Sequence, residues 1–418
     1  MNARGVLALP DFRRIWIAQT ISDFGDGLTN LALLIVVFSL TGTTAAIALM
    51  AIVIAVPQLT IGIVAGVYVD RFDRRRIMLA SDLLRAIVVL AFIAVRSPDL
   101  LPLLYLLAFV EASVGTFFGP ARMAFVPAIV PADGLLAANG VSQASRIVAT
   151  TLGAGAAGIL FGLAESAWPA FTIDALTFIA SFVLVLGVRT RQALEPAPAG
   201  GREGLGTSLR IGLRTVADSP ILVGVLVAAG GMMLGIGAVN VLFIPLLRNQ
   251  LGVPITWLGV VDLAQTASMI LSVGLVSILA ARLRPARIVT FGMVGLAVLV
   301  ALVAGVTAVW QVLLLLFAAG WFITPLQAAI STIVQTATDD ARRGRVAAVL
   351  NAVVSGAGIV SMAAAGILGD ALGVRTVFLI AAGVVAVAAA ASVVLFTKAT
   401  VRPSSTPEPS GALGLPLD

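Results

Sequence analysis

The chain has 418 residues, of which 60% are hydrophobic and 11% are charged, and its mean hydropathy is +1.10. Soluble domains average roughly 45–50% apolar and about 25% charged residues, so this composition indicates a polytopic membrane protein. The net charge of +6 does not indicate nucleic-acid binding, because the arginines lie in short loops between apolar segments. Cys and His are absent, so no disulfide, no thiol nucleophile and no ordinary zinc site can be built, and any proton carrier must be a carboxylate. We expect no metal and no cofactor.

Apolar segments long enough to cross a bilayer recur along the whole chain. A helix needs about 20 residues to do so, and twelve such segments can be counted. We therefore predict an all-α membrane protein with twelve transmembrane helices. The predicted spans are residues 15–40, 45–69, 77–95, 100–125, 138–163, 169–188, 221–247, 257–280, 288–306, 309–335, 346–368 and 375–396.

The basic residues are distributed unevenly over the loops between these spans. With the N-terminus placed inside, the inside segments hold 20 of the 26 Lys and Arg residues, and the outside loops hold only Arg96, Arg248 and Arg375. Short loops rich in Lys and Arg stay on the cytoplasmic side of a membrane. We expect a multi-pass protein of the cell inner membrane with both termini in the cytoplasm.

A segment rich in Pro and Gly interrupts the apolar pattern at mid-chain and includes a short amphipathic stretch at 208–216. Matching residues stand at similar distances into the two sides: Gly119-Pro120 corresponds to Thr324-Pro325, and Asp133 to Asp339. Such matches indicate two parallel repeats. We predict an N-terminal six-helix half (1–189), a cytoplasmic linker (190–220), a C-terminal six-helix half (221–398) and a disordered tail (399–418).

The loop between the second and third spans has the highest charge density of the chain, with six charges in residues 70–76. Together with Gly66, it resembles the signature loop Gly-x-x-x-Asp-Arg-x-Gly-Arg-Arg-Arg/Lys of the major facilitator superfamily. Asp73 stands in place of the usual second glycine, which resembles the branch of enterobactin exporters and macrolide-efflux proteins. The resemblance covers nearly all of residues 11–400.

This resemblance implies a fold of two six-helix pseudo-repeats and a role for the loop as a latch at the cytoplasmic ends of the helices. Arg122, near the inner end of the fourth span, is a candidate partner of Asp70. The alternatives are a loop that only fixes topology and an Arg122 side chain that only reaches toward the membrane surface. The expected latch residues are Gly66, Asp70, Arg71, Asp73, Arg74, Arg75, Arg76 and Arg122.

Polar side chains inside the predicted spans are the candidates for coupling and for lining a cavity. Asp23, Asp26 and Asn30 are three, four and seven residues apart, which places them on one face of the first span. Glu111 in the fourth span and Gln327 in the tenth complete this set. A carboxylate at membrane depth costs ~2.5–3.5 kcal/mol, so it is functional or paired. The alternative is that these groups only make structural hydrogen bonds between helices.

The fifth span contains Gly153, Gly155 and Gly158, a spacing that favours closely packed helices. It is no dinucleotide site, because no strand precedes it. The stretch also resembles the antiporter motif Gly-Pro-x-x-Gly-Gly of efflux transporters, with Ala154 and Ala157 at two of the motif positions.

No catalytic set and no phosphate-binding motif occurs in the sequence, so we predict a protein that is not an enzyme and is not driven directly by ATP. The prediction is a proton-coupled secondary transporter, an antiporter for efflux of a drug, siderophore or other hydrophobic or amphipathic molecule. Its expected partners are the substrate, protons and membrane lipid, with no nucleic acid, and we expect a monomer. An importer or facilitator of the same fold and a non-transporting membrane scaffold or sensor are the alternatives.

Overall fold

The computed structural model describes residues 1–69, 71–164, 166–190, 205–254 and 256–401. Helices and connecting turns make up this part of the chain, and no strand occurs in it. Ten of the described helices are long and apolar enough to cross a membrane, and the bent pair α10 (Trp257–Leu271) and α11 (Val273–Arg282) can form an eleventh span. The prediction of an all-α membrane protein is confirmed, and the predicted count of twelve spans is met only if α4 also crosses.

Helix α4 (Arg74–Phe92) stands where the third span is predicted. It is too polar to qualify by composition, because it carries three arginines in its first turn and both Asp82 and Arg85 further on. It packs along α5 (Leu101–Phe125) and α7 (Trp168–Leu186), and Asp82 and Arg85 are buried. These charges face other helices, so packing inside the bundle holds this helix in place.

Proline and glycine fix where several helices begin and end. Pro10, Pro220 and Pro285 each stand in a first turn, where the missing N–H costs no hydrogen bond. Gly42 and Gly373 follow helix ends with φ of 69° and 83°, a region that side chains disfavour. The remaining helices are α1 (Ala3–Leu7), α2 (Pro10–Thr41), α3 (Thr44–Val69), α6 (Leu135–Ala164), α8 (Leu205–Ala217), α9 (Pro220–Pro245), α12 (Pro285–Val303), α13 (Val309–Thr336), α14 (Asp340–Leu372) and α15 (Val374–Val401).

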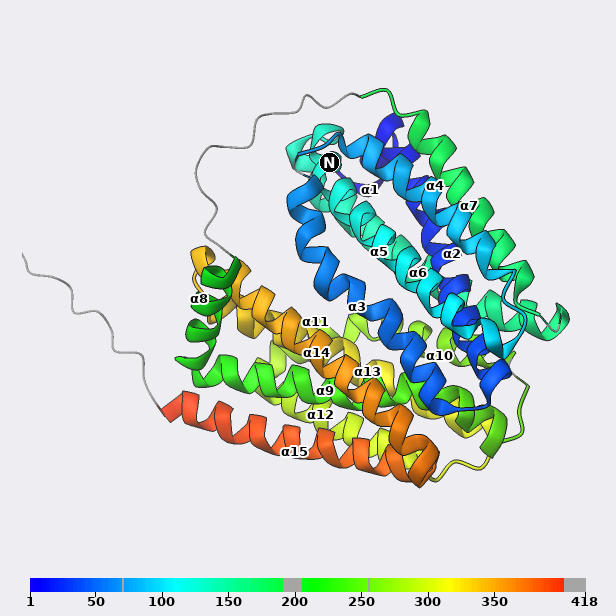
Figure 1. Cartoon of the computed structure of the whole chain (residues 1–418). Helices are drawn as coiled ribbons and strands as arrows, with labels where there is room; N and C mark the ends of the chain where they lie inside the picture. The colour runs from blue at the N-terminus through cyan, green and yellow to red at the C-terminus, as the bar shows by residue number, and fades with distance from the viewer. Residues whose placement is uncertain (70, 165, 191–204, 255, 402–418) are drawn as a thin grey trace, which may run out of the picture.

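The packing of the first six long helices repeats in the later ones (Figure 1). In the first group, α2 packs on α6 and α7, α3 packs on α5, and α4 packs on α5 and α7. In the second group, α9 packs on α14 and α15, α10 packs on α13, and α12 packs on α13 and α15. The order of partners is the same, which agrees with the predicted pseudo-repeats.

The short helix α8 includes the predicted amphipathic stretch and packs against α14. Helix α15 continues to Val401, three residues past the predicted end of the C-terminal half. Residues 191–204 of the predicted linker and 402–418 of the predicted tail lie outside the described residues.

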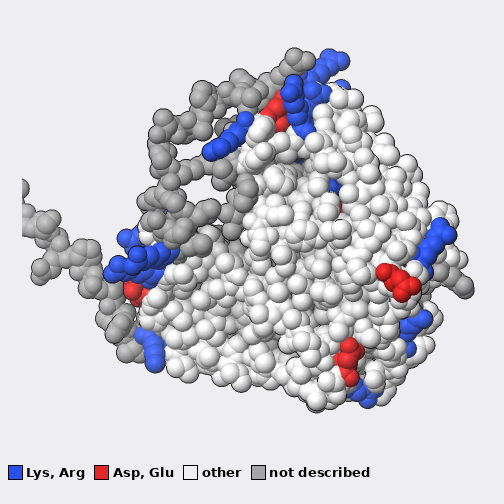
Figure 2. All heavy atoms as spheres, in the orientation of Figure 1, with Lys and Arg blue, Asp and Glu red and all other residues white. Residues whose placement is uncertain are grey.

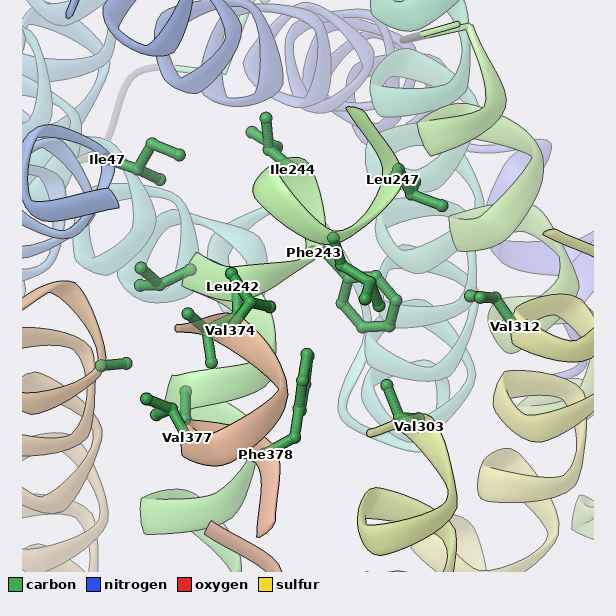
Figure 3. Packing of buried hydrophobic residues seen from close by; sticks show 14 of the residues in the cluster. Ile47, Leu242, Phe243, Ile244, Leu247, Val303, Val312, Val374, Val377 and Phe378 are labelled. Atoms are coloured by element: carbon green, nitrogen blue, oxygen red, sulfur yellow. The ribbon is translucent and has the colours of Figure 1, made fainter. Parts of the chain in front are cut away.

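Two ends of the bundle are distinguished by what they carry. We call the end with α1, α8 and the last turns of α15 the termini face; it runs from the top of Figure 1 to its left side. The opposite end is the far face. A large apolar cluster joins the two helix groups toward the far face and includes Ile47 of α3, Phe243 of α9 and Phe378 of α15 (Figure 3). Burial of this apolar surface holds the groups together at that end.

The surface carries few charges across its middle. Figure 2 shows a broad face of uncharged atoms, with Lys, Arg, Asp and Glu gathered toward its edges. Large exposed apolar side chains such as Leu106, Phe291 and Val387 contribute to the uncharged surface of the molecule. Such a surface suits contact with lipid tails.

Candidate functional site

A cavity of about 510 Å³ lies between the two helix groups. Residues of α2 and α3 line it from one group, and residues of α9, α10, α12, α13 and α14 line it from the other. Its walls are mostly aliphatic, with Phe243 as the aromatic member. Among the described residues, four polar side chains reach it: Asn30, Asn240, Asp262 and Gln265. A concave apolar site of this size with a few polar groups suits a drug-sized ligand.

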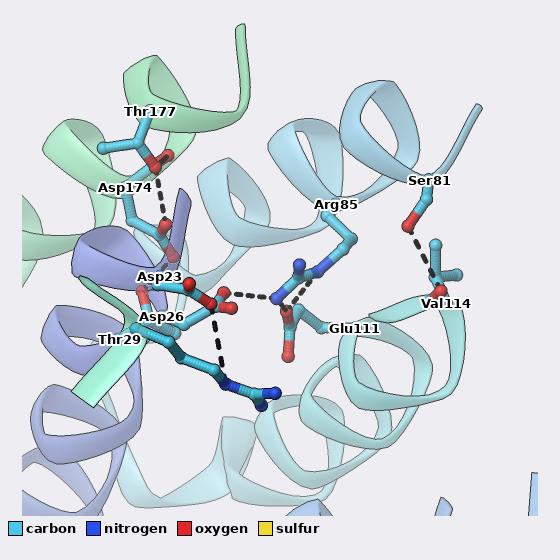
Figure 4. A network of polar contacts seen from close by, with 10 residues as sticks. Asp23, Asp26, Thr29, Ser81, Arg85, Glu111, Val114, Asp174 and Thr177 are labelled. Atoms are coloured by element: carbon cyan, nitrogen blue, oxygen red, sulfur yellow. Dashed lines mark hydrogen bonds and ion pairs between the residues drawn. The ribbon is translucent and has the colours of Figure 1, made fainter. Parts of the chain in front are cut away.

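A buried ionic cluster lies inside the first helix group (Figure 4). Arg85 of α4 donates from Nε to Glu111 of α5 at 2.7 Å and contacts the same carboxylate oxygen through Nη2 at 2.6 Å. Nη2 also donates to Asp26 of α2. The guanidinium lies 4.1 Å from the ring centroid of Phe178, a cation–π contact from α7. One arginine therefore connects four helices.

Two further buried acids surround this cluster. Asp174 of α7 accepts hydrogen bonds from the hydroxyls of Thr29, at 2.5 Å, and Thr177, at 3.1 Å. Asp82 of α4 accepts one from Ser181 at 2.7 Å, and its Oδ1 has no hydrogen-bond partner among the described residues. Buried carboxylates are tolerated where partners satisfy them, so these hydroxyls stabilise a core that is unusually acidic for a membrane helix bundle.

Asp23 and Arg146 form a second pair, 3.8 Å apart, between α2 and α6. Asp23 is buried and one of its oxygens has no hydrogen-bond partner among the residues that the structure describes, whereas the side chain of Arg146 is 55% exposed. The Nε of Arg122 is also buried and has no hydrogen-bond partner in the described part of the chain. The predicted pairing of Arg122 with Asp70 lies outside the described residues, because residue 70 is not among them.

The three polar residues predicted on one face of the first span have different surroundings in the structure. Asp23 contacts α6 and Asp26 contacts α4, while Asn30 is exposed and lines the cavity. Glu111, predicted as a cavity carboxylate, is buried against Arg85 and does not line the cavity. Gln327 is exposed on α13 and is not among the lining residues.

The arginines of the loop after α3 bind the ends of neighbouring helices. Asp73 is the N-cap of α4 and accepts from the backbone N–H groups of residues 75 and 76. Arg74 donates to the carbonyl of Ala124 at 3.1 Å, and Arg75 donates from Nε to that of Val185 at 3.2 Å. Cationic side chains are favourable at helix C-termini, so these contacts stabilise the ends of α5 and α7.

The remaining described residues of the predicted latch lie from the last turn of α3 to the first turn of α4. Arg76 is 3.7 Å from Asp73, and Arg71 is exposed. Gly66 lies in the last turns of α3, whereas Asp70, the central residue of the predicted latch, is outside the described residues. The latch itself stays a prediction.

At the far face, an acid of the second group binds a helix of the first. Asp370, near the end of α14, accepts from the backbone N–H of Thr44 at 2.8 Å and that of Ala45 at 3.0 Å. These are the first residues of α3, where unpaired N–H groups and the helix dipole favour an anion. We call this contact the far-face clasp. Gly366 lets α14 approach α3 closely, because a Cβ there would overlap Ala48.

The glycines of the predicted packing motif lie at two helix crossings. A Cβ on Gly153 would overlap the carbonyl of Phe24, so this glycine allows α6 to approach α2. Gly155 faces Gly259 of α10, across the boundary between the two groups. Gly158 is buried in α6. A hydrogen bond of 3.1 Å between the hydroxyls of Thr151 and Thr266 spans the same crossing.

Sequence reasoning did not assign Arg85 or Asp262 to the site. Arg85 lies in the middle of a predicted span, and Asp262 is a lone acid in the eighth predicted span. Ionisable residues at these positions are candidates for a functional role. The sequence position of each residue does not show which helix its side chain contacts. Among the described residues there is no group of three side chains suited to a metal ion.

Comparison with known proteins gives consistent matches over most of the chain. A family described as transmembrane secretion effector matches residues 5–411. The uncharacterized MFS-type transporter YfiS of Bacillus subtilis is 26% identical over 394 residues, covering 91% of this chain and 90% of that protein. The enterobactin exporter EntS of Escherichia coli is 25% identical over 346 residues, covering 81% and 80%.

Solved structures match the fold at lower sequence identity. A mutant of the nucleoside transporter NupG has a TM-score of 0.77 and 14% identity, covering 92% of this chain and 99% of that one. A bacterial homolog of the human lysosomal transporter Spinster, solved in an inward-facing and unoccupied conformation, has a TM-score of 0.72 and 14% identity. It covers 94% of this chain and 98% of its own. These likenesses concern the fold alone.

Proposed function

The chain belongs to the transmembrane secretion effector family of MFS-type membrane transporters, and we propose that it exports a hydrophobic or amphipathic small molecule in exchange for protons. A membrane transporter of this kind is not an enzyme: it moves its substrate without changing it. The enterobactin exporter at 25% identity supports export as the direction. The arginine bias of the loops supports a cell-membrane location with the termini face in the cytoplasm.

The observation that carries proton coupling is the position of the cluster of Asp26, Arg85 and Glu111. Asp26 precedes cavity-lining Asn30 by four residues on α2, so the two side chains lie one helical turn apart. With both carboxylates ionised the cluster carries one net negative charge, and one proton makes it neutral. A proton bound there changes the cost of keeping the cluster buried, and a carrier can use that change to favour one conformation.

The two carboxylates differ in their access to water. The side chain of Asp26 is 26% exposed and that of Glu111 is 9% exposed, although Arg85 contacts both. We assign to Asp26 the exchange of a proton with water. We assign to Glu111 the role of holding the Arg85 side chain in place. Arg85 then passes the change in charge from α2 to α4 and α5.

Alternating access needs the two helix groups to separate at one end while they join at the other. In this structure the far-face clasp and the apolar cluster join them at the far face. We propose that this is the state that loads substrate from the cytoplasm. The opposite state closes the termini face, where the latch predicted at Asp70 contributes.

Everted membrane vesicles from cells that express the protein test the function. Respiration acidifies their interior, so an exporter should accumulate rhodamine 6G, N-phenyl-1-naphthylamine or anilinonaphthalene sulfonate inside, and nigericin should release it. Vesicles without the protein are the control. An importer would instead drive the dye outward, a facilitator would only equilibrate it, and a scaffold would have no effect on any of the three dyes. Any of these results contradicts the proposal.

A further inference from the structure

We propose that Asp262 binds the positive charge of the substrate, and that the transported molecule is an amphipathic monocation. This inference rests on the proposed transport function and specifies its substrate class. Asp262 lies on α10 and lines the cavity between the two helix groups. It provides the acidic group of the cavity, and the described part of the lining contains no Lys or Arg.

Asp262 differs from the other acids inside the spans of the described chain because it has no ion pair or hydrogen bond to another described residue. Asp26 and Glu111 are bonded to Arg85, and Asp82 and Asp174 are bonded to hydroxyls. Asp23 lies beside Arg146, whereas none of the described residues places a donor or a cation against the Asp262 carboxylate. A carboxylate in an apolar wall without a partner is costly, and a bound cation removes most of that cost.

The surroundings of Asp262 define the rest of the ligand. Gln265 is three residues along the same helix face, and Asn30 and Asn240 reach the cavity from α2 and α9. These amides are neutral, so they can hydrogen-bond a ligand without selecting its charge. The aliphatic walls and Phe243 favour an apolar body, and about 510 Å³ accommodates one of drug size. The lining residues that the structure describes include no cation that would bind an anion.

The place of Asp262 also connects ligand binding to the boundary between the groups. It follows Gly259 by three residues, so both lie on one side of α10, and Gly259 meets Gly155 of α6. A cation held at Asp262 therefore sits beside a crossing that must move when the groups separate. Asp26, the acid assigned to proton exchange, is in the other group, so substrate and proton occupy different sites.

Equilibrium binding to the purified full-length protein tests this inference with two probes of nearly the same shape and opposite charge, tetraphenylphosphonium and tetraphenylborate. The wild type should bind the phosphonium at least about tenfold more tightly than the borate, the size expected of one buried charge contact. Asp262→Asn should remove that preference. Asp262→Glu should retain it, and Asp99→Asn, which removes an exposed acid outside the cavity, should leave it unchanged.

The inference is overturned if the wild type binds both probes equally or neither probe, or if a folded Asp262→Asn keeps the preference. Thermal unfolding of each variant shows whether it is folded. If Asp262→Asn loses the preference and the other variants keep it, the cation site is supported. This holds even if no dye accumulates in everted vesicles; the absence of accumulation would reject the proposed function separately. Dye accumulation without an Asp262-dependent preference would retain the function and reject the cation site.

Discussion

Arg85 is the residue on which the buried polar core depends. Its guanidinium neutralises charge on Asp26 and Glu111 and contacts the ring of Phe178, so its removal leaves two carboxylates without a cation in a region of low dielectric constant. The sequence indicated that an arginine lies inside the third span. It did not indicate the partners, because which side chains meet depends on how α2, α4 and α5 are rotated and shifted against one another.

Arg85→Gln should therefore lower the free energy of unfolding by about 3–5 kcal/mol, the usual cost of breaking a buried ion pair. Combining it with Glu111→Gln should recover part of this loss, because one of the stranded charges is then removed. Unfolding in a denaturing detergent measures both effects. Arg96→Gln, at an exposed arginine, is the matched control and should change stability by less than about 0.5 kcal/mol. Equal stabilities of the Arg85 and Arg96 variants would show that the cluster is energetically unimportant.

Among the elements, α3 and α14 carry the contact most directly linked to conformation. The clasp can form only while the far-face ends of these two helices are together, so it favours the state closed at that face. The sequence predicted α3 to end at residue 69, as it does, but placed the start of the span in α14 at residue 346. Helix α14 begins at Asp340 because polar residues continue the helix beyond its apolar stretch. Apolar length alone does not locate such ends.

Asp370→Asn should shift the population toward the state open at the far face by a factor of about 2–5. An exposed acid at a helix N-terminus contributes ~0.3–1 kcal/mol, which sets this range. A single cysteine at cavity-lining Ala55 should then react faster with an impermeant maleimide added on the far side; the chain has no native Cys to remove. Asp99→Asn is the control, and Asp70→Asn should shift the population the other way. An unchanged rate in Asp370→Asn would show that the clasp does not bias the state.

The architecture of the whole molecule, two groups of helices, could be predicted from three features of the sequence. These are the lengths of the apolar segments, the charges of the loops between them, and residues that recur at the same distance in both halves. The cavity is less predictable because it forms between groups, where small rotations decide which residues face it. Asn30 was expected there and lines it, whereas Gln327, expected to face it from α13, does not.

The break between α10 and α11 was also not foreseen from the sequence. Ser272 lies at the break, and its hydroxyl donates to the carbonyls of Met269 and Gly320. Hydrogen bonds of this kind from a serine side chain bend helices.

Coupling of proton movement to transport by the buried carboxylates is the claim on which the proposed function depends. Proteoliposomes that contain either the wild type or the variant Asp26→Asn/Glu111→Gln test it, with rhodamine 6G flux measured under an imposed pH gradient and without one. The wild type should accumulate the dye against its concentration gradient. The variant should still exchange dye down a concentration gradient, because the cavity is intact, and should lose gradient-driven accumulation. Accumulation by the variant at the wild-type rate would contradict the claim and leave these acids with a structural role.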